Sequence, residues 1–224
     1  MKQKRKLVIV GDSAFAEIAF EYFDADSDYC PVAFAVEAQY LKRNSINNIP
    51  VVPFETLTST HPSSEHDIYV AIVYSQLNRL RTRLAKSAKS SGYKLASYIS
   101  SKCFIWRNVQ MGEHVFIFED NTIQPFVVIG DNVVLWSGNH IGHHSKISDN
   151  VFISSHVVIS GFCTIGDNCF LGVNSAIGNN IEIQEDCWIG PGASIAKNIS
   201  SDSIVRAPEP DISKIGARRF FKVK

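Results

Sequence analysis

The sequence has no excess of charge of either sign and no long hydrophobic run. Its 22 Lys and Arg residues are balanced by 22 Asp and Glu residues, so the formal net charge is zero. Nucleic-acid binding needs a basic face, and the balance therefore gives no indication of a nucleic-acid partner. Lys2 to Lys6 leads into only a short apolar stretch. The sequence thus predicts neither a signal peptide nor a membrane span, and the cytoplasm is the expected location.

Cysteine pairs and glycine-rich motifs are also missing. The five cysteines include no CxxC pair, which argues against a disulfide framework and a zinc knuckle. Four of them fall in one slot of the repeat described next, so we expect inert core thiols. The turn Gly11–Ala16 has one glycine where GxGxxG needs three, and Asp12 would repel a phosphate at the helix start. A dinucleotide cofactor is therefore not expected.

What the sequence has instead is a six-residue repeat that runs from Cys103 to Ala196. A helix does not keep one face over a period of six, and a flat strand has a period of two, whereas β-helix coils stack short strands at this period. The repeat therefore predicts a parallel β-helix. The sixteen aliphatic positions are Ile105, Met111, Ile117, Ile123, Ile129, Leu135, Ile141, Ile147, Ile153, Ile159, Ile165, Leu171, Ile177, Ile183, Ile189 and Ile195.

The other positions of the hexad agree with a β-helix. The slot two residues before each aliphatic residue mostly takes small or modest side chains, as expected inside a narrow coil. Glycine often follows the aliphatic residue, as at Gly130, Gly142 and Gly166, and Asp or Asn often comes next. Gly and Asn tolerate a positive φ, so we expect each hexad to form one side and one tight corner of a coil.

The first 98 residues lack the hexad and predict a small α/β domain. Their alternation of strands and helices indicates a parallel sheet of the nucleotide-binding type. We expect strands at 6–10, 31–36, 50–52 and 68–73, and helices at 14–23 and 78–91. The predicted parts of the chain are a substrate-binding α/β domain at 1–98, a β-helix at 99–200 and a C-terminal tail at 201–224.

A small α/β domain followed by aliphatic-Gly hexads resembles the hexapeptide-repeat sugar acyltransferases of the sialic acid O-acetyltransferase and bacillosamine-pathway N-acetyltransferase type. The resemblance covers essentially the whole chain, including the passage Gly92–Leu95 between the two domains. It implies three hexads per coil and a left-handed winding, although the general rule for parallel crossovers favours the opposite hand. It also implies a homotrimer that transfers an acyl group, most simply from acetyl-CoA, to a sugar or nucleotide sugar.

The same resemblance implies that the turn after the first strand contacts the sugar nucleotide. Gly11 and Ser13 match the family's loop, with Asp12 between them, whereas the residues that follow depart from its pattern. The glycine usual after the third strand is replaced near Val73. Glu37 corresponds to an acidic residue that helps to bind the nucleotide in some members. We therefore expect Gly11, Asp12, Ser13 and Glu37 to bind substrate.

The chemistry is expected in the stretch Asn139–Ser145, which holds three histidines within five positions. A histidine titrates near pH 6.5 and suits a general base at neutral pH. One coil after His143 the equivalent position is Gly161, which leaves an open lane where an acyl-thioester arm could reach the imidazole. The family's catalytic histidine aligns with His143, and His144 stands where the family has an acidic partner.

The remaining catalytic parts are expected from the backbone and from neighbouring polar groups. No Ser or Cys lies in a nucleophile-elbow setting, so we expect direct attack on the thioester rather than an acyl-enzyme. A backbone N–H at a glycine corner could hold the oxyanion. Asn139 and Asp149 are both candidates to orient His143.

The resemblance implies CoA contacts along a groove of the β-helix. Phe152 aligns with a family histidine that holds the cofactor, and His156 either substitutes for that histidine or is structural. Gly161, Val173 and Gly190 are the other expected contacts. The basic residues of the tail either reach the phosphates of CoA or are solvated.

Aromatic residues in the hexads are expected at a buried face between subunits, because they would be costly to leave in water. This face would place His143 at a subunit boundary. The aromatic residues are Trp106, Phe118, Phe126, Trp136, Phe162, Phe170 and Trp188.

Two other functions stay open. One is a carbonic anhydrase of the β-helical type, with zinc bound by histidines from the group His140, His143, His144 and His156. Stacked ligands should recur every eighteen residues, and the equivalent positions around 104–108, 122–126 and 158–162 contain no His, so a metal is not expected. The other is a non-catalytic hexapeptide scaffold. The sequence leaves open N- or O-acylation, the sugar, its nucleotide and the acyl length.

Overall fold

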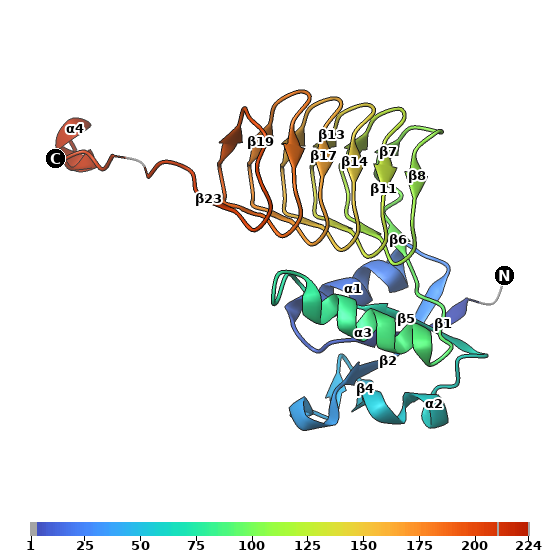
Figure 1. Cartoon of the computed structure of the whole chain (residues 1–224). Helices are drawn as coiled ribbons and strands as arrows, with labels where there is room; N and C mark the ends of the chain where they lie inside the picture. The colour runs from blue at the N-terminus through green and yellow to red at the C-terminus, as the bar shows by residue number, and fades with distance from the viewer. Residues whose placement is uncertain (1–3, 210, 224) are drawn as a thin grey trace.

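The apolar runs of the first 98 residues form a five-stranded sheet in the order β3-β4-β2-β1-β5, in which only β3 is antiparallel. The computed structural model describes residues 4–209 and 211–223 (Figure 1). Helix α1 covers one face of the sheet and α3 the other. The strands are β1 (Arg5–Val10), β2 (Tyr29–Val36), β3 (Ser45–Ile46), β4 (Ile49–Pro53) and β5 (His66–Val70), and the helices are α1 (Ala14–Ala25), α2 (Leu57–Thr60) and α3 (Arg79–Ser90).

The predicted elements of this domain are confirmed, and one boundary differs informatively. The sequence predicts a strand over 68–73, whereas β5 ends at Val70. The next apolar residues leave the sheet because Arg81 of α3 takes the carbonyl oxygens of Ile72 and Val73 as hydrogen-bond acceptors, at 3.2 and 3.1 Å. The segment after β5 is thereby turned towards the β-helix.

The hexads form a left-handed β-helix with three sheets, as the resemblance implies. From β6 to β22 each strand pairs with residues eighteen positions away, for example Ile123 with Ile141 and Ile141 with Ile159. The docking face, which carries the α/β domain, contains β6 (Tyr98–Ile99), β9 (Phe116–Ile117), β12 (Val134–Leu135), β15 (Phe152–Ile153), β18 (Phe170–Leu171), β21 (Trp188–Ile189) and β23 (Ile204–Val205). Face 2 contains β7 (Phe104–Ile105), β10 (Thr122–Ile123), β13 (His140–Ile141), β16 (Val158–Ile159), β19 (Ala176–Ile177) and β22 (Ser194–Ile195). Face 3 contains β8 (Gln110–Met111), β11 (Val128–Ile129), β14 (Lys146–Ile147), β17 (Thr164–Ile165) and β20 (Glu182–Ile183).

The aliphatic series fills the interior of the β-helix. Fourteen of its sixteen members are at most 4% exposed, and Ile105 and Met111 of the first coil pack against the same core. Three of the cysteines, Cys163, Cys169 and Cys187, are buried beside them, and burial raises the pKa of Cys169 to about 12. The prediction of inert core thiols is confirmed for these three, whereas Cys103, the fourth cysteine of the slot, is half-buried and packs against the same core.

The residues with positive φ at the coil corners are not the glycines that the sequence analysis expected. Positive φ falls on the third residue after fourteen of the sixteen aliphatic residues, as at His144 (59°), His156 (57°) and Asn168 (60°). The glycine directly after the aliphatic residue is needed for another reason: a Cβ on Gly166 would lie 2.5 Å from the backbone nitrogen of Glu185 in the next coil. Glycine there permits the close approach of two coils rather than a tight turn.

We expect Gly166→Ala to lower the free energy of unfolding by about 1–3 kcal/mol through overpacking. For a chain of this length each kcal/mol lowers Tm by roughly 2–4 °C. Thermal unfolding followed by circular dichroism checks this. Gly178→Ala is the matched control, because Gly178 has the same hexad position. A Cβ on Gly178 would lie 3.3 Å from the nearest neighbouring atom. Equal losses in the two variants would contradict the close-approach argument.

Aromatic side chains join the two domains. Phe118 and Phe170 of the docking face are 2% and 6% exposed, and Trp136 and Trp188 pack partly buried against the same cluster, which includes Phe15 of α1. The expectation that these four residues lie between subunits is therefore wrong: their partner is the α/β domain of the same chain. Trp106, Phe126 and Phe162 are 41%, 56% and 54% exposed and stay available for another surface.

A buried arginine ties the α/β domain to two coils. Arg81 is 0% exposed and donates to both the side chain and the carbonyl of Asn132, at 2.9 and 3.1 Å, and to the carbonyl of Asn150 at 3.3 Å. Its guanidinium also lies 5.8 Å from the ring centre of Phe152. Burial lowers the pKa of Arg81 to about 10, so the group is still cationic at neutral pH. Backbone carbonyl oxygens and side-chain amide oxygens accept its hydrogen bonds and stabilise this charge.

A second buried link is His114, whose tautomer follows from its partners. Its Nε2 accepts the Val70 N–H at 2.8 Å, so Nδ1 carries the proton and donates to Asn132 Oδ1 at 2.7 Å. Burial lowers the pKa of His114 to about 3. The folded chain thus keeps this ring neutral where the unfolded chain, titrating near 6.5, binds a proton.

This difference makes stability depend on pH in one direction. The contribution of neutral His114 to the free energy of unfolding is fully present above about pH 6.5. It is lost as pH falls, by up to about 1.4 kcal/mol per pH unit. Urea unfolding between about pH 6.5 and pH 5 measures the slope. His114→Asn should remove this share of it, whereas His156→Asn, at an exposed corner with the same positive φ, should not. An unchanged slope in His114→Asn would rule out this assignment.

No helix within the described ranges is long and apolar enough to cross a membrane.

Candidate active site

His143 and His144 occupy a corner of the β-helix between β13 on face 2 and β14 on face 3. The imidazole of His143 lies across Gly161 of the next coil, where a Cβ would come within 2.7 Å of its Cε1. The missing side chain at Gly161 therefore makes room for the imidazole itself. Both histidines are exposed at this corner.

The two imidazoles contact each other directly. Their Nδ1 atoms are 3.1 Å apart and the rings meet at 87°, so one Nδ1–H donates to the other Nδ1. His144 is stacked between Phe126 and Phe162, with centroid distances of 4.5 and 4.8 Å. His143 and Phe162 also meet at nearly a right angle, with ring centres 5.0 Å apart. The two exposed phenyl rings hold the histidine pair in one arrangement.

Gln124 holds the corner backbone and was not recognised in the sequence. Its Oε1 accepts the His143 N–H at 2.9 Å from one coil below. Asn139 and Asp149 do not orient His143: their carbonyl or carboxylate oxygens accept the N–H groups of Val157 and Asp131, each at 2.8 Å. The only signal for Gln124 in the sequence is its position one coil before the corner.

The glycine N–H groups beside the histidines already have acceptors. Gly142 donates to the carbonyl of Ile159 at 2.7 Å, and Gly161 donates to Asn179 Oδ1 at 3.0 Å. The Gly142 bond belongs to the coil ladder. The Gly161 bond ends on a side chain, and an oxyanion at this N–H would have to displace the Asn179 amide.

The other residues expected to bind CoA do not gather around His143 within one chain. Phe152 is 2% exposed beneath the α/β domain, and Gly190 is buried beside the ring of Trp188. His156 lies at the corner between the docking face and face 2, with its ring over Gly138. Val173 lies at that same corner one coil later and is 37% exposed. Gly161 alone is in contact with His143.

The turn after β1 lies at the carboxyl edge of the parallel sheet. Gly11 has φ of 124°, and a Cβ there would lie 2.8 Å from the carbonyl oxygen of Ala71, so glycine is required where the β1 turn meets the end of β5. Ser13 precedes α1 with no hydrogen bond from its side chain. Arg43, which the sequence analysis missed, lies 3.7 Å from the Asp12 carboxylate. A cation thus stands beside the first turn of α1.

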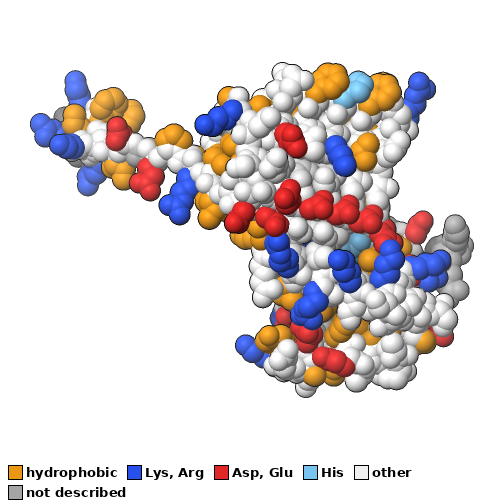
Figure 2. Space-filling view, in the orientation of Figure 1, with side chains coloured by type: hydrophobic (Ala, Val, Ile, Leu, Met, Phe, Trp, Pro, Cys, Tyr) orange, Lys and Arg blue, Asp and Glu red, His pale blue; other side chains and the backbone are white. Residues whose placement is uncertain are grey.

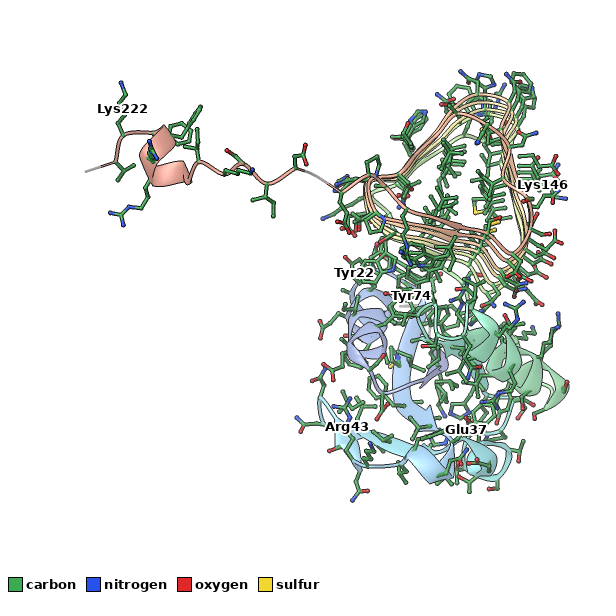
Figure 3. All side chains as sticks on the ribbon, turned by 60° about the vertical axis from the view of Figure 1, so that its left-hand side comes forward. Tyr22, Glu37, Arg43, Tyr74, Lys146 and Lys222 are labelled. Atoms are coloured by element: carbon green, nitrogen blue, oxygen red, sulfur yellow. The ribbon has the colours of Figure 1, made fainter. Side chains whose placement is uncertain are left out.

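Glu37 is engaged elsewhere. Both of its carboxylate oxygens accept hydrogen bonds from Arg83 of α3, at 2.9 and 2.8 Å, which lowers the pKa of Glu37. Figure 3 shows Glu37 and Arg43 on different flanks of the α/β domain. Glu37 follows β2 at the same carboxyl edge as the Gly11 turn, where the Gly11 N–H donates to the Ala35 carbonyl at 2.8 Å, but its carboxylate is paired with Arg83.

A pocket of about 420 Å³ opens between the loop after β5 and the last coils, lined by Leu77, Trp188 and Arg206 among others. Ligands of open α/β sheets bind beyond the carboxyl ends of the strands where the strand order reverses, which here is between β1 and β5. Three successive residues of the loop, Gln76 to Asn78, have positive φ, and Asn78 is pinned by bonds to two carbonyls of the β-helix. Strain of this kind gathers at functional sites.

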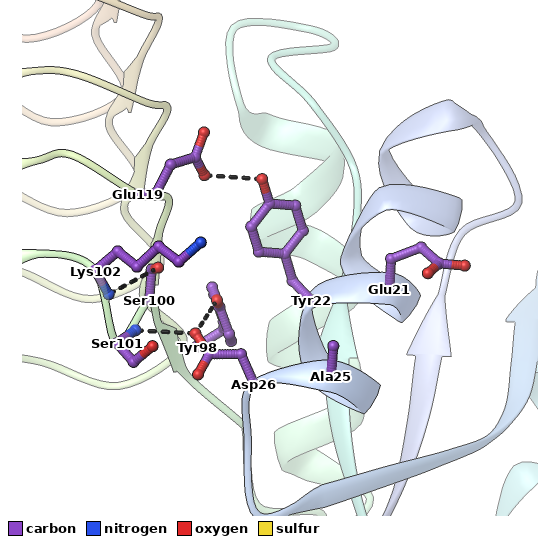
Figure 4. Close-up of a pocket in the computed structure, with 9 residues that line it drawn as sticks. All are labelled: Glu21, Tyr22, Ala25, Asp26, Tyr98, Ser100, Ser101, Lys102 and Glu119. Carbon is purple, nitrogen blue, oxygen red and sulfur yellow. Dashed lines mark hydrogen bonds between the residues drawn. The ribbon is translucent and has the colours of Figure 1, made fainter.

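A second pocket, of about 460 Å³, lies at the other end of α1 (Figure 4). Tyr22 donates to Glu119 at 2.8 Å, and Asp26 accepts from Tyr98 and from the Ser101 N–H at 2.8 and 2.9 Å. Burial raises the pKa of Tyr22 to about 12. These bonds close the junction between the domains, far along α1 from Ser13.

The catalytic corner and the sheet edge lie on opposite sides of the chain. Each coil passes from face 2 to face 3 and then to the docking face, so the corner at His143 is the vertex opposite the docking face. The α/β domain packs on the docking face. One chain therefore keeps His143 away from its own Gly11 turn.

Histidines of one chain do not assemble a metal centre here. Within residues 4–209 and 211–223, no three His, Cys, Asp or Glu side chains come together as ligands of one ion. A zinc site of the carbonic anhydrase type would need ligands from a second copy.

Comparison with known proteins identifies the repeats. A model of the family "Bacterial transferase hexapeptide (six repeats)" matches residues 108–143 and 144–179. No curated protein matches the chain by sequence.

Solved structures share the whole two-domain arrangement. The acetyltransferase domain of PglB from Neisseria gonorrhoeae, in complex with acetyl coenzyme A, superposes with a TM-score of 0.80 at 22% identity, over 90% of this chain and 95% of that one. PerB from Caulobacter crescentus, in complex with CoA and GDP-perosamine, gives 0.80 at 21% identity over 89% and 92%. WeeI from Acinetobacter baumannii gives 0.77 at 18% over 91% and 97%. The predicted resemblance is confirmed for the repeats of residues 108–179 and for the fold: the chain contains hexapeptide repeats of the bacterial transferase type and has the two-domain fold of these acetyltransferase structures.

Proposed function

We propose that the protein is an acyltransferase that moves an acetyl group from acetyl-CoA to an amino or hydroxyl group of a nucleotide-linked sugar. The observation that carries this proposal is the exposed imidazole pair of His143 and His144 at a coil corner. PglB and PerB, which have the same fold, are solved with acetyl-CoA, and with CoA and GDP-perosamine. The sheet edge at Gly11 to Ser13 has the chemistry to take the nucleotide, because it leads into the N-terminus of α1 and Arg43 offsets the charge of Asp12 that would otherwise repel a phosphate.

His143 is the general base of the proposed reaction. The acceptor nitrogen or oxygen attacks the thioester carbonyl carbon while Nε2 of His143 takes its proton. The tetrahedral intermediate then collapses, the carbon–sulfur bond breaks, and the proton passes from His143 to the leaving thiolate of CoA. No covalent bond to the enzyme forms, in keeping with the buried thiols of Cys163, Cys169 and Cys187.

His144 is the positioning residue for this base. When Nδ1–H of His143 donates to Nδ1 of His144, the Nε2 atom of His143 is left free to accept a proton. A neutral imidazole stabilises the imidazolium less than a carboxylate would, because it carries no opposite charge. The stacking of Phe126 and Phe162 compensates by fixing the acceptor ring.

We expect His143→Ala to lower kcat by about 10²- to 10⁴-fold, the usual contribution of a general base. His144→Asp should move the acidic limb of the pH–rate profile to higher pH, because a carboxylate stabilises the imidazolium. Aspartate fits this corner, since Asp186 has the same positive φ of 61°. The test is CoA release with acetyl-CoA and a nucleotide amino sugar. Full activity in His143→Ala would refute the assignment, and an unmoved pH profile in His144→Asp would remove the role given to His144.

A complete site requires a second copy of the chain, and the trimer expected from the resemblance supplies it. The corner that carries His143 is flanked by Phe126 and Phe162, 56% and 54% exposed, and packing against another copy would take these rings out of water. The neighbouring copy then contributes its own sheet edge at Ser13, and CoA lies between the two.

Mixed assemblies test this division. We expect His143→Ala and Ser13→Glu to be inactive alone, since one loses the base and the other places a negative charge where the nucleotide would bind. The two variants, unfolded and refolded together in equal amounts, should recover about a quarter of wild-type activity. A site is intact only when one copy supplies His143 and its neighbour supplies Ser13, and random mixing gives that combination at about a quarter of the interfaces. Refolding each variant alone is the control. No recovery, with mixed oligomers verified by mass, would mean that base and sugar site belong to one chain.

A further inference from the structure

The segment Ile212–Val223 projects away from both domains (Figure 1). In the described part of the chain its hydrogen bonds join its own residues, as in the short helix α4 (Ala217–Phe220). Lys222 lies far from the β-helix in Figure 3. Among the described residues, no other part of the chain covers this segment.

Large apolar and cationic side chains are interspersed in the segment, and acidic residues are absent from it. Its large apolar residues are strongly exposed, and Phe220 and Phe221 stand together with ring centres 5.0 Å apart. The apolar residues and their exposed fractions are Ile212 (92%), Ile215 (52%), Phe220 (68%), Phe221 (74%) and Val223 (57%). The cations are Lys214, Arg218, Arg219 and Lys222. Solvation alone accounts for the cations but leaves the five apolar side chains in water.

We propose that residues 212–223 bind the surface of an anionic lipid bilayer. Aromatic and aliphatic side chains enter the boundary between headgroups and acyl chains, while Lys and Arg lie against the anionic headgroups. The segment is far too short to span a bilayer, which needs about 20 apolar residues in a helix. Its composition fits a reversible surface contact.

A second copy of the chain is a weaker partner, because its most acidic surface is already engaged. Figure 2 shows a row of acidic side chains along the β-helix, above the Lys and Arg side chains of the α/β domain. In this column, Asp131, Asp149 and Asp167 each accept a backbone N–H of the preceding coil at 2.8 to 3.0 Å. Lys86 and Lys89 of α3 face the same column. Anionic lipid offers charge that the protein has not already matched.

The proposed trimer would strengthen the contact. Every copy would release its segment after β23, at the same end of the β-helix, so three segments would reach one surface and bind with avidity. This addition rests on the proposed assembly, whereas the chemistry of the segment does not depend on it or on the acyltransferase activity.

The test is flotation of the full chain with lipid vesicles. We expect binding to vesicles of phosphatidylcholine mixed with phosphatidylglycerol, little binding to phosphatidylcholine alone, and release by salt. Arg218→Glu/Arg219→Glu should weaken binding by at least roughly 25-fold, since each cation at an anionic surface contributes about fivefold. Phe220→Ser/Phe221→Ser should weaken it by about tenfold or more while keeping the charge.

A matched control changes the same charge elsewhere. Lys42→Glu/Lys94→Glu reverses two exposed lysines of the α/β domain and should bind like the wild type. Equal binding by all variants, or equal binding to neutral vesicles, would overturn the proposal. So would a chain truncated after Glu209 that binds vesicles normally but forms smaller assemblies by light scattering, because the segment would then dock on a second copy. Acetyl transfer by Phe220→Ser/Phe221→Ser, which keeps every cation of the tail, is expected to be unchanged, which separates this proposal from the proposed activity.

Discussion

The eighteen-residue register of the coils is the constraint on which the rest of the structure depends. It stacks Ile123, Ile141 and Ile159 in the interior and sets each corner over the one before it. Coils approach so closely that a Cβ on Gly142 would lie 2.5 Å from the backbone carbon of Ser160. Because every strand is only two residues long, no coil is stable alone, and the stack forms one cooperative unit. The positions of outward-facing side chains are therefore fixed by the interior and not by their own contacts.

The corners are where this register leaves freedom for function. The third residue after the aliphatic one has a positive φ at these corners. Asn and Asp adopt this φ at low cost, and His tolerates it better than most side chains. Asn150 and Asn168 occupy that position as turn formers at the vertex between face 3 and the docking face, whereas Phe126, His144 and Phe162 occupy it in three successive coils at the vertex between face 2 and face 3. A phenylalanine there is strained with no benefit to the turn. The stack of three rings against His143 is what offsets that strain.

The interior could be read from the sequence, whereas the junction between the domains could not. A period of six and a small slot are properties of single positions, so the β-helix follows from the sequence, whereas the coil length of three hexads, on which the corner at His143 depends, came from the family resemblance. Which of the outward aromatics meet the α/β domain depends on where that domain docks, and no local pattern encodes this for Phe118 or Trp136. Arg81 is similar: as one more cation on an amphipathic helix it gave no signal, although its bonds to Asn132 and Asn150 join two domains. The pairing of Glu37 with Arg83 likewise could not be predicted from the sequence, because the two residues meet only when α3 packs on the sheet.

The docking of the α/β domain on one face of a triangular prism has a consequence for the chemistry. It reserves one face for the domain and leaves the opposite vertex, with its histidine pair, as far from the Gly11 turn as the prism allows. A hinge could not close that separation, because Arg81, His114 and Asn78 hold the two domains through buried hydrogen bonds. A base and a sugar site that are rigidly kept apart in one chain can cooperate only across two chains. The buried links that stabilise the monomer are therefore the same features that make assembly a condition of the proposed reaction.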